Sequence, residues 1–137
     1  MRPPRWSTEA KLSSLQLRSL FDVNVFGIQR TLRAVLPAFR AQGDGLVVNI
    51  GSILGRVTFP FFGVYDASKF AIEALTDSYR YELSKLGSDV VLVQPSNYPT
   101  NIFASAQRPA DATRGTQLMK DLGLGQFAEP RTGPAAA

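Results

Sequence analysis

Two short apolar runs separated by one long amphipathic stretch constrain the fold of this chain more than any other feature of its sequence. Residues 46–50 and 89–94 are apolar without the alternation of a half-exposed strand, which is typical of strands buried on both faces of a parallel sheet. Between them, residues 64–86 repeat apolar side chains at helical spacing, and Gly87 follows as a natural C-cap. Strand, helix and strand in this order predict a βαβ unit with a right-handed crossover.

Another amphipathic helix is predicted before this unit. Apolar side chains at steps of three and four run from Leu17 to Phe39, and Asn24 lies on the same stripe. The Gly-Asp-Gly sequence at 43–45 ends the pattern, so the helix covers residues 17–41, with a kink expected at Pro37. Because two parallel strands make a marginal sheet, the pattern implies neighbouring strands that these residues do not supply.

Composition excludes several classes of site. The chain has 137 residues, enough for one domain, with no cysteine and no histidine, so disulfides, thiol nucleophiles, histidine bases and the common zinc sites are excluded, and we expect no metal. The net charge of +4 comes from basic residues scattered between apolar helix positions, which does not favour nucleic-acid binding. No apolar run is long enough for a membrane span or a secretory leader, and we expect a cytoplasmic protein.

General acid–base chemistry in this chain must use Tyr, Lys, Asp or Glu. Tyr65 and Lys69 are four residues apart on the predicted helix 64–86 and therefore share a face. A neighbouring ammonium lowers the pKa of a phenol, which would let Tyr65 exchange a proton with an alcohol or carbonyl near neutral pH. The pair taken alone fits an interfacial tyrosine beside a lysine that extends to solvent equally well.

Further polar residues are predicted at the same edge of the sheet. Ser52 directly follows the first strand and residues 95–100 follow the second, and ligands bind at the carboxyl ends of strands in open α/β sheets. Asn24, on the stripe of the earlier helix, needs hydrogen-bond partners if it is buried. We expect Asn24, Ser52, Tyr65 and Lys69 to converge there.

Three stretches of the sequence resemble the classical short-chain dehydrogenase/reductase family. They are residues 21–27, Phe-Asp-Val-Asn-Val-Phe-Gly, residues 47–52, Val-Val-Asn-Ile-Gly-Ser, and residues 65–71, Tyr-Asp-Ala-Ser-Lys-Phe-Ala. The resemblance implies a partial Rossmann-like doubly wound parallel sheet, an α/β fold whose C-terminal βαβ half is present and whose N-terminal half is absent. It divides the chain into a leader (1–13), the C-terminal catalytic half (14–103), a segment like the family's substrate loop (104–129) and a tail (130–137).

The same resemblance implies roles for the converging residues. Tyr65 is the general acid/base, Ser52 hydrogen-bonds the substrate oxygen, and Lys69 lowers the phenol pKa and holds the nicotinamide ribose. Asn24 anchors a water of the proton relay. Tyr65, Lys69, Pro95, Tyr98 and Thr100 form the implied cofactor contacts.

The cofactor implied by the resemblance is NAD or NADP. The family's glycine-rich pyrophosphate turn, Thr-Gly-x-x-x-Gly-x-Gly, does not occur in the chain, and Ser96 replaces a glycine of the segment 95–100. Residues 59–62, Phe-Pro-Phe-Phe, suggest a lipophilic substrate wall, although they would suit a core equally well.

Two functions follow from the sequence. One is an NAD(P)-dependent oxidoreductase of a secondary alcohol or ketone, truncated and not active alone. The other is a non-catalytic remnant that binds a full-length relative. The expected partners are a small-molecule substrate and a further copy or relative, with association through helices 17–41 and 64–86.

Overall fold

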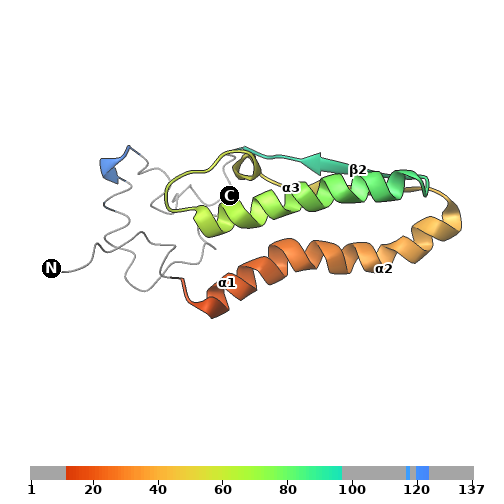
Figure 1. Ribbon diagram of the computed structural model, residues 1–137, viewed down its shortest axis with the longest axis horizontal. Coiled ribbons are helices and arrows are strands. Elements are labelled where there is room, and N and C mark those ends of the chain that lie inside the picture. The colour runs from red at the N-terminus through yellow and green to blue at the C-terminus, as the bar shows by residue number, and fades with distance from the viewer. Residues whose placement is uncertain (1–11, 97–116, 118–119, 124–137) are drawn as a thin grey trace, which may run out of the picture.

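The computed structural model describes residues 12–96, 117 and 120–123. Its elements are α1 (Ser14–Phe21), the π-helical turn η2 (Asp22–Phe26), α2 (Gly27–Gln42), β1 (Gly45–Ile50), the 3-10 turn η3 (Ile53–Gly55), α3 (Gly63–Ser84) and β2 (Ser88–Val93). Strands β1 and β2 pair in parallel, from Gly45 opposite Ser88 to Ile50 opposite Val93. The predicted βαβ unit is therefore confirmed, and α1, η2 and α2 form one long rod beside α3 (Figure 1).

The helix ends follow from local sequence. Ser13 caps α1, because its hydroxyl accepts a hydrogen bond from the Gln16 amide at 3.2 Å while the Gln16 side chain accepts one from the Ser13 amide. Gly43 ends α2 with φ of 74°, and Gly87 ends the segment after α3 with φ of 72°, a backbone region that glycine enters without a steric cost. Helix α2 stays α-helical past Pro37 as far as Gln42.

The predicted single helix over 17–41 is interrupted by the π-helical turn η2. Such a turn inserts one residue into the α-helical register, and π turns occur frequently at functional sites. Asn24 lies in this turn, half-buried, next to the buried Val25.

The apolar core lies between α2, α3 and β2. Leu32, Leu83 and Val90 form its buried cluster, and partly buried side chains pack against it: Val35, Leu36, Val47 and Tyr79. A buried hydrogen bond of 2.9 Å from Asn49 Nδ2 to Thr76 Oγ1 joins β1 to α3 beside this core. The core thus fixes the orientation of α3 relative to the strands.

The prediction that both faces of the strands are buried is wrong for the described residues. Alternate apolar side chains on one face are exposed: Leu46, Val48, Ile50, Val91 and Val93. The physical reason is that α2 and α3 cover only the other face, and no other described element reaches the exposed one. Within the described part of the chain β1 pairs only with β2, and a hollow of about 580 Å³ lies beside β1 and the inner side of α2.

Candidate active site

The turn after β1 is tied to the end of β2. The Gly51 amide donates to the Val93 carbonyl at 2.8 Å, and the Ile53 amide donates to the Pro95 carbonyl at 3.1 Å. Ser52 lies between these two contacts and is buried. The structure therefore brings Ser52 and Pro95 to the same carboxyl edge of the sheet, as the sequence predicts.

Tyr65 and Lys69 lie one turn apart near the amino end of α3, facing this edge. Lys69 Nζ is 5.6 Å from the centroid of the Tyr65 ring and donates a hydrogen bond of 3.3 Å to the carbonyl of Ile50, the last residue of β1. The Ser52 hydroxyl accepts a hydrogen bond from the Leu54 amide at 3.1 Å. It also lies near enough to the Tyr65 phenol to lower the pKa of that group. A serine side chain from the turn after β1 thus meets a tyrosine and a lysine side chain from α3.

The pKa of Tyr65 differs from the sequence-based expectation. Burial raises the phenol pKa above its ordinary value, the hydrogen bond with Ser52 lowers it, and the charge of Asp66 raises it. Burial also lowers the pKa of the Lys69 ammonium. Lys69 is not among the causes of the Tyr65 pKa shift, because its Nζ donates to the Ile50 carbonyl and does not pair with the phenol oxygen.

Asn24 joins the site through a residue that the sequence analysis missed. Asn24 Nδ2 donates to Ser68 Oγ at 3.1 Å, and Ser68 Oγ donates to the Tyr65 carbonyl at 2.7 Å. Ser68 is fully buried. The π turn of the first helix rod is therefore linked to the backbone of the first turns of α3.

Asp66 is a second missed residue. It is 1% exposed, and its Oδ2 accepts a hydrogen bond from the Phe59 amide at 3.1 Å. Its Oδ1 has no hydrogen-bond partner among the residues that the structure describes. Burial raises the pKa of this carboxyl, while the Phe59 amide lowers it. Asp66 could have been identified from its position in the first turn of the predicted helix, because the helix dipole favours negative charge there.

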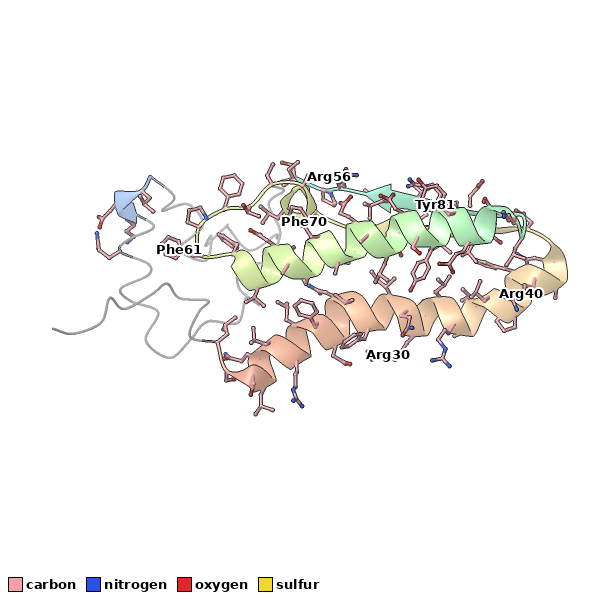
Figure 2. The ribbon with its side chains drawn as sticks, in the orientation of Figure 1. Arg30, Arg40, Arg56, Phe61, Phe70 and Tyr81 are labelled. Atoms are coloured by element: carbon pink, nitrogen blue, oxygen red, sulfur yellow. The ribbon has the colours of Figure 1, made fainter. Side chains whose placement is uncertain are left out.

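The aromatic segment 59–62 borders the site and lies outside the core cluster. Phe59 is 42% exposed, Phe61 and Phe62 are half-buried, and Phe61 takes a positive φ of 73°, which is uncommon for a bulky residue. Figure 2 shows Phe61 in the loop that leads to the amino end of α3. The segment is therefore not part of the described core cluster, and a substrate wall stays a prediction.

Two predicted cofactor contacts, Tyr98 and Thr100, lie outside the described residues, as do most of the predicted leader, loop and tail. Among the residues that the structure describes, no group of three or more acidic side chains could hold a metal ion. None of the described helices is both long and apolar enough to cross a bilayer.

The protein-family model described as short chain dehydrogenase matches residues 5–111. An uncharacterised oxidoreductase of Bacillus subtilis, YusZ, is 36% identical over 110 residues, covering 77% of this chain and 39% of the relative. The mitochondrial D-beta-hydroxybutyrate dehydrogenase of Rattus norvegicus is 38% identical over 130 residues, covering 88% of this chain and 37% of the relative.

Solved structures give the same result for the fold. A short chain dehydrogenase/reductase from Burkholderia phymatum, crystallised in complex with NAD, superposes with a TM-score of 0.72 at 26% identity. The match covers 95% of this chain and 49% of that protein. The chain therefore spans about half the length of this solved structure and less than half of the curated relatives it matches.

Proposed function

Because the chain belongs to the short-chain dehydrogenase family, we propose that it carries the proton-transfer part of an NAD(P)-dependent oxidoreductase acting on a secondary alcohol or ketone. The observation that carries this proposal is the meeting of Ser52, Tyr65 and Lys69 at the carboxyl edge of the sheet. A phenol, a hydroxyl and an ammonium suit a reaction in which a carbonyl oxygen gains negative charge and then a proton.

The residues divide the work of carbonyl reduction between them. The phenol of Tyr65 gives its proton to the substrate oxygen, and the Ser52 hydroxyl donates a hydrogen bond to the same oxygen as it becomes alkoxide-like. The raised pKa of Tyr65 keeps the phenol protonated at neutral pH, as a general acid requires. Asn24 contacts the first turns of α3 through Ser68. We also propose that Asn24 anchors a water of the proton relay.

The nicotinamide, when bound, supplies the hydride. Lys69 suits the ribose hydroxyls, because an ammonium has three donor hydrogens and its hydrogen bond to the Ile50 carbonyl uses one of them. The proposed nicotinamide end of the site consists of Lys69, Tyr65 and Pro95. Tyr98 and Thr100, which lie outside the described residues, complete it in the proposal. The choice between NAD and NADP is left open by these residues.

The substrate class rests on two further observations. The rat relative is named for beta-hydroxybutyrate, which is a secondary alcohol. The exposed and half-buried aromatic side chains of segment 59–62 beside the site favour a substrate with a lipophilic part.

Binding of the reduced cofactor tests how much of the site these residues provide. We expect no saturable change of nicotinamide fluorescence when the 137-residue chain is titrated with NADH or NADPH, because it contains no glycine-rich pyrophosphate turn. Micromolar affinity for either cofactor would contradict this expectation.

Activity requires a completed domain. We would join the chain to the amino-terminal part of the Bacillus subtilis relative and follow oxidation of NADH and NADPH with a panel of ketones. Tyr65→Phe should lower the rate by about 10²- to 10⁴-fold, the usual contribution of a general acid. Tyr81→Phe is the matched control, since Tyr81 is 78% exposed near the far end of α3 (Figure 2). An unchanged rate in the Tyr65 variant would refute the proposed role.

A second candidate function is a non-catalytic partner that binds a full-length relative. The exposed apolar face of β1 and β2 favours it, because a contiguous apolar surface of this kind commonly marks an interaction site. Association through α1–α2 and α3 remains part of this candidate. Sedimentation of the chain with and without a full-length relative tests whether the two associate. The variant Val48→Lys then distinguishes the two surfaces, because it should abolish association through the sheet face and leave association through the helices.

A further inference from the structure

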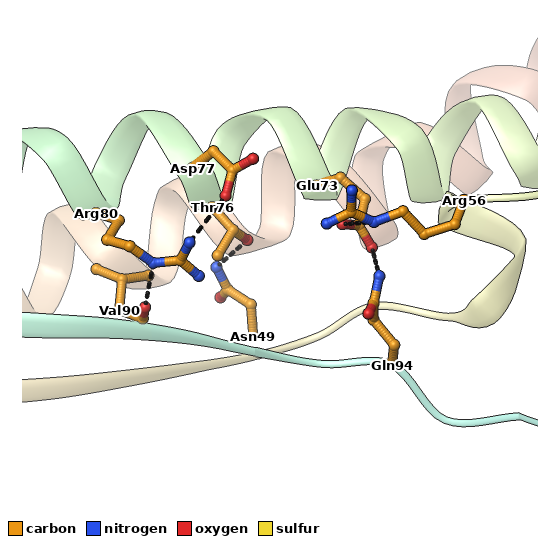
Figure 3. A network of polar contacts seen from close by, with 8 residues as sticks. All are labelled: Asn49, Arg56, Glu73, Thr76, Asp77, Arg80, Val90 and Gln94. Carbon is orange, nitrogen blue, oxygen red and sulfur yellow. Dashed lines mark hydrogen bonds and ion pairs between the residues drawn. The ribbon is translucent and has the colours of Figure 1, made fainter.

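Glu73 is a buried carboxylate that the proposed chemistry does not use. It lies four residues after Lys69 on α3, and its side chain is 9% exposed. Oε1 accepts a hydrogen bond of 2.6 Å from Gln94 Nε2, and Oε2 lies 2.9 Å from Arg56 Nε (Figure 3). A buried charge is costly unless it is paired, so its presence here calls for a physical reason.

The two partners of Glu73 come from the two segments that form the edge of the site. Arg56 ends the serine turn, which we define as residues 51–56 and which contains Ser52. Gln94 directly follows β2 and precedes Pro95. Figure 3 shows the Glu73 carboxylate between the side chains of Arg56 and Gln94. One side chain of α3 thus contacts both the serine turn and the end of β2.

The serine turn packs directly on Glu73. A Cβ atom at Gly55 would lie 2.8 Å from Glu73 Oε1, a separation that real Cβ atoms essentially never show, and 3.1 Å from the carbonyl oxygen of Lys69. At Gly51 a Cβ atom would lie 3.0 Å from Leu92 Cδ1 and 3.4 Å from Glu73 Oε1. The position of the turn therefore depends on where the Glu73 carboxylate is held.

We propose that Glu73 is a positioning residue, whose carboxylate holds the serine turn against α3 and the end of β2 and thereby sets the contact between Ser52 and Tyr65. This inference rests on the proposed function for its catalytic meaning, but the contact itself is measurable without turnover. The competing explanation is a buried ion pair that only stabilises the fold. Arg56 and Gln94 are exposed, so both stay hydrated when Met, of similar volume, replaces the Glu73 carboxylate. The two explanations therefore differ in whether Glu73→Met changes the contact between Ser52 and Tyr65.

The experiment follows the ionisation of tyrosines in the full chain by NMR of ¹³Cζ-labelled tyrosine, with Tyr65 assigned through Tyr65→Phe. Ser52→Ala defines the effect of losing the Ser52 contact, which is an upward shift of the pKa of Tyr65, because that hydrogen bond lowers it. Glu73→Met should reproduce most of this upward shift. Tyr79, which packs against the core, should titrate unchanged in the same spectra.

Gln94→Ala provides a second variant in case Glu73→Met does not fold. Gln94 is exposed, so its truncation leaves the core intact, and we expect a smaller shift of Tyr65 in the same direction. Thr76→Val is the matched control: it removes a buried hydrogen bond of α3 one turn further along, and it should lower stability without moving Tyr65.

The inference is overturned if Tyr65 titrates in the folded Glu73→Met or Gln94→Ala chain as it does in the parent. It is equally overturned if Thr76→Val shifts Tyr65 as far as Glu73→Met does, since general loosening would then explain the effect. The proposed function is tested separately: it is refuted if the completed domain carrying Tyr65→Phe reduces ketones at the parent's rate.

Discussion

The two ends of α3 bury different kinds of side chain. Its amino-terminal part, residues 63–73, buries Asp66, Ser68 and Glu73 together with Ile72, and it presents Tyr65 and Lys69 to the sheet edge. Its carboxyl-terminal part, residues 76–84, buries Leu83 against Leu32 and Val90. Apolar packing at one end therefore anchors the helix, while the polar contacts at the other end place groups that can transfer a proton.

The largest effect is expected at the apolar end. Leu83→Ala removes a side chain that is 4% exposed at the centre of the core cluster, and it should cost about 2–5 kcal/mol of unfolding free energy. Urea denaturation followed by circular dichroism measures this loss. If Leu83→Ala costs less than Tyr81→Ala, a truncation at a mostly exposed position, the anchoring role of this end is wrong.

A smaller loss is expected where the two parts of α3 meet. Thr76→Val leaves the buried Asn49 amide without its acceptor, and it should cost roughly 1–3 kcal/mol in the same denaturation experiment. Thr76→Ser, which retains a hydroxyl acceptor, serves as its control and should cost less. Equal losses in the two variants would mean that the methyl group stabilises this position as much as the hydrogen bond does, which would contradict the prediction.

The polar end should respond to pH through Asp66. Burial raises the pKa of this carboxyl in the folded chain, so the folded state binds the proton more tightly than the unfolded state. The contribution of Asp66 to folding stability is therefore fully present below its pKa in the unfolded chain. That contribution is lost as pH rises through its pKa in the folded chain. Asp66→Asn should flatten this decline in stability with rising pH, measured as thermal unfolding across the acid range. A variant with the parent's pH dependence would show that Asp66 is not its source.

The smallest effect is expected outside both parts of α3. Ser13→Ala removes the capping hydrogen bond to the Gln16 amide at the start of α1 and should cost about 1 kcal/mol. Denaturation measures the loss, and Ser13→Asp, which restores a side-chain acceptor, should recover it. A shift in the ionisation of Tyr65 in Ser13→Ala would contradict the separation between the helix start and the site.

The sequence predicted the positions that local rules control. Gly43 ends α2 as expected, because a left-handed residue after a helix is a local requirement. Helix α3 ends earlier than expected, at Ser84 with Lys85 as its C-cap, and Gly87 takes its positive φ in the turn that follows. The edge shared by Ser52, Tyr65 and Lys69 was predicted because the carboxyl ends of parallel strands lie together.

What the sequence did not predict depends on tertiary packing. The π turn around Asn24 has no residue signature, since it is an inserted residue in otherwise helical backbone. Asp66, Ser68 and Glu73 are polar, so the apolar pattern does not mark them as buried. Their burial comes from neighbouring segments that pack over α3. The strands have the composition of a sheet buried on both faces, yet the described residues cover only one.

The pH dependence of ketone reduction by the completed domain tests the central claim most directly. The phenol must be protonated to act as an acid, so the rate should fall as pH rises through the pKa of Tyr65, and this limb should move to higher pH in Ser52→Ala, because the hydrogen bond that lowers the pKa is lost. A limb that stays in place in Ser52→Ala, or that persists in Tyr65→Phe, would contradict the assignment of proton transfer to this end of α3.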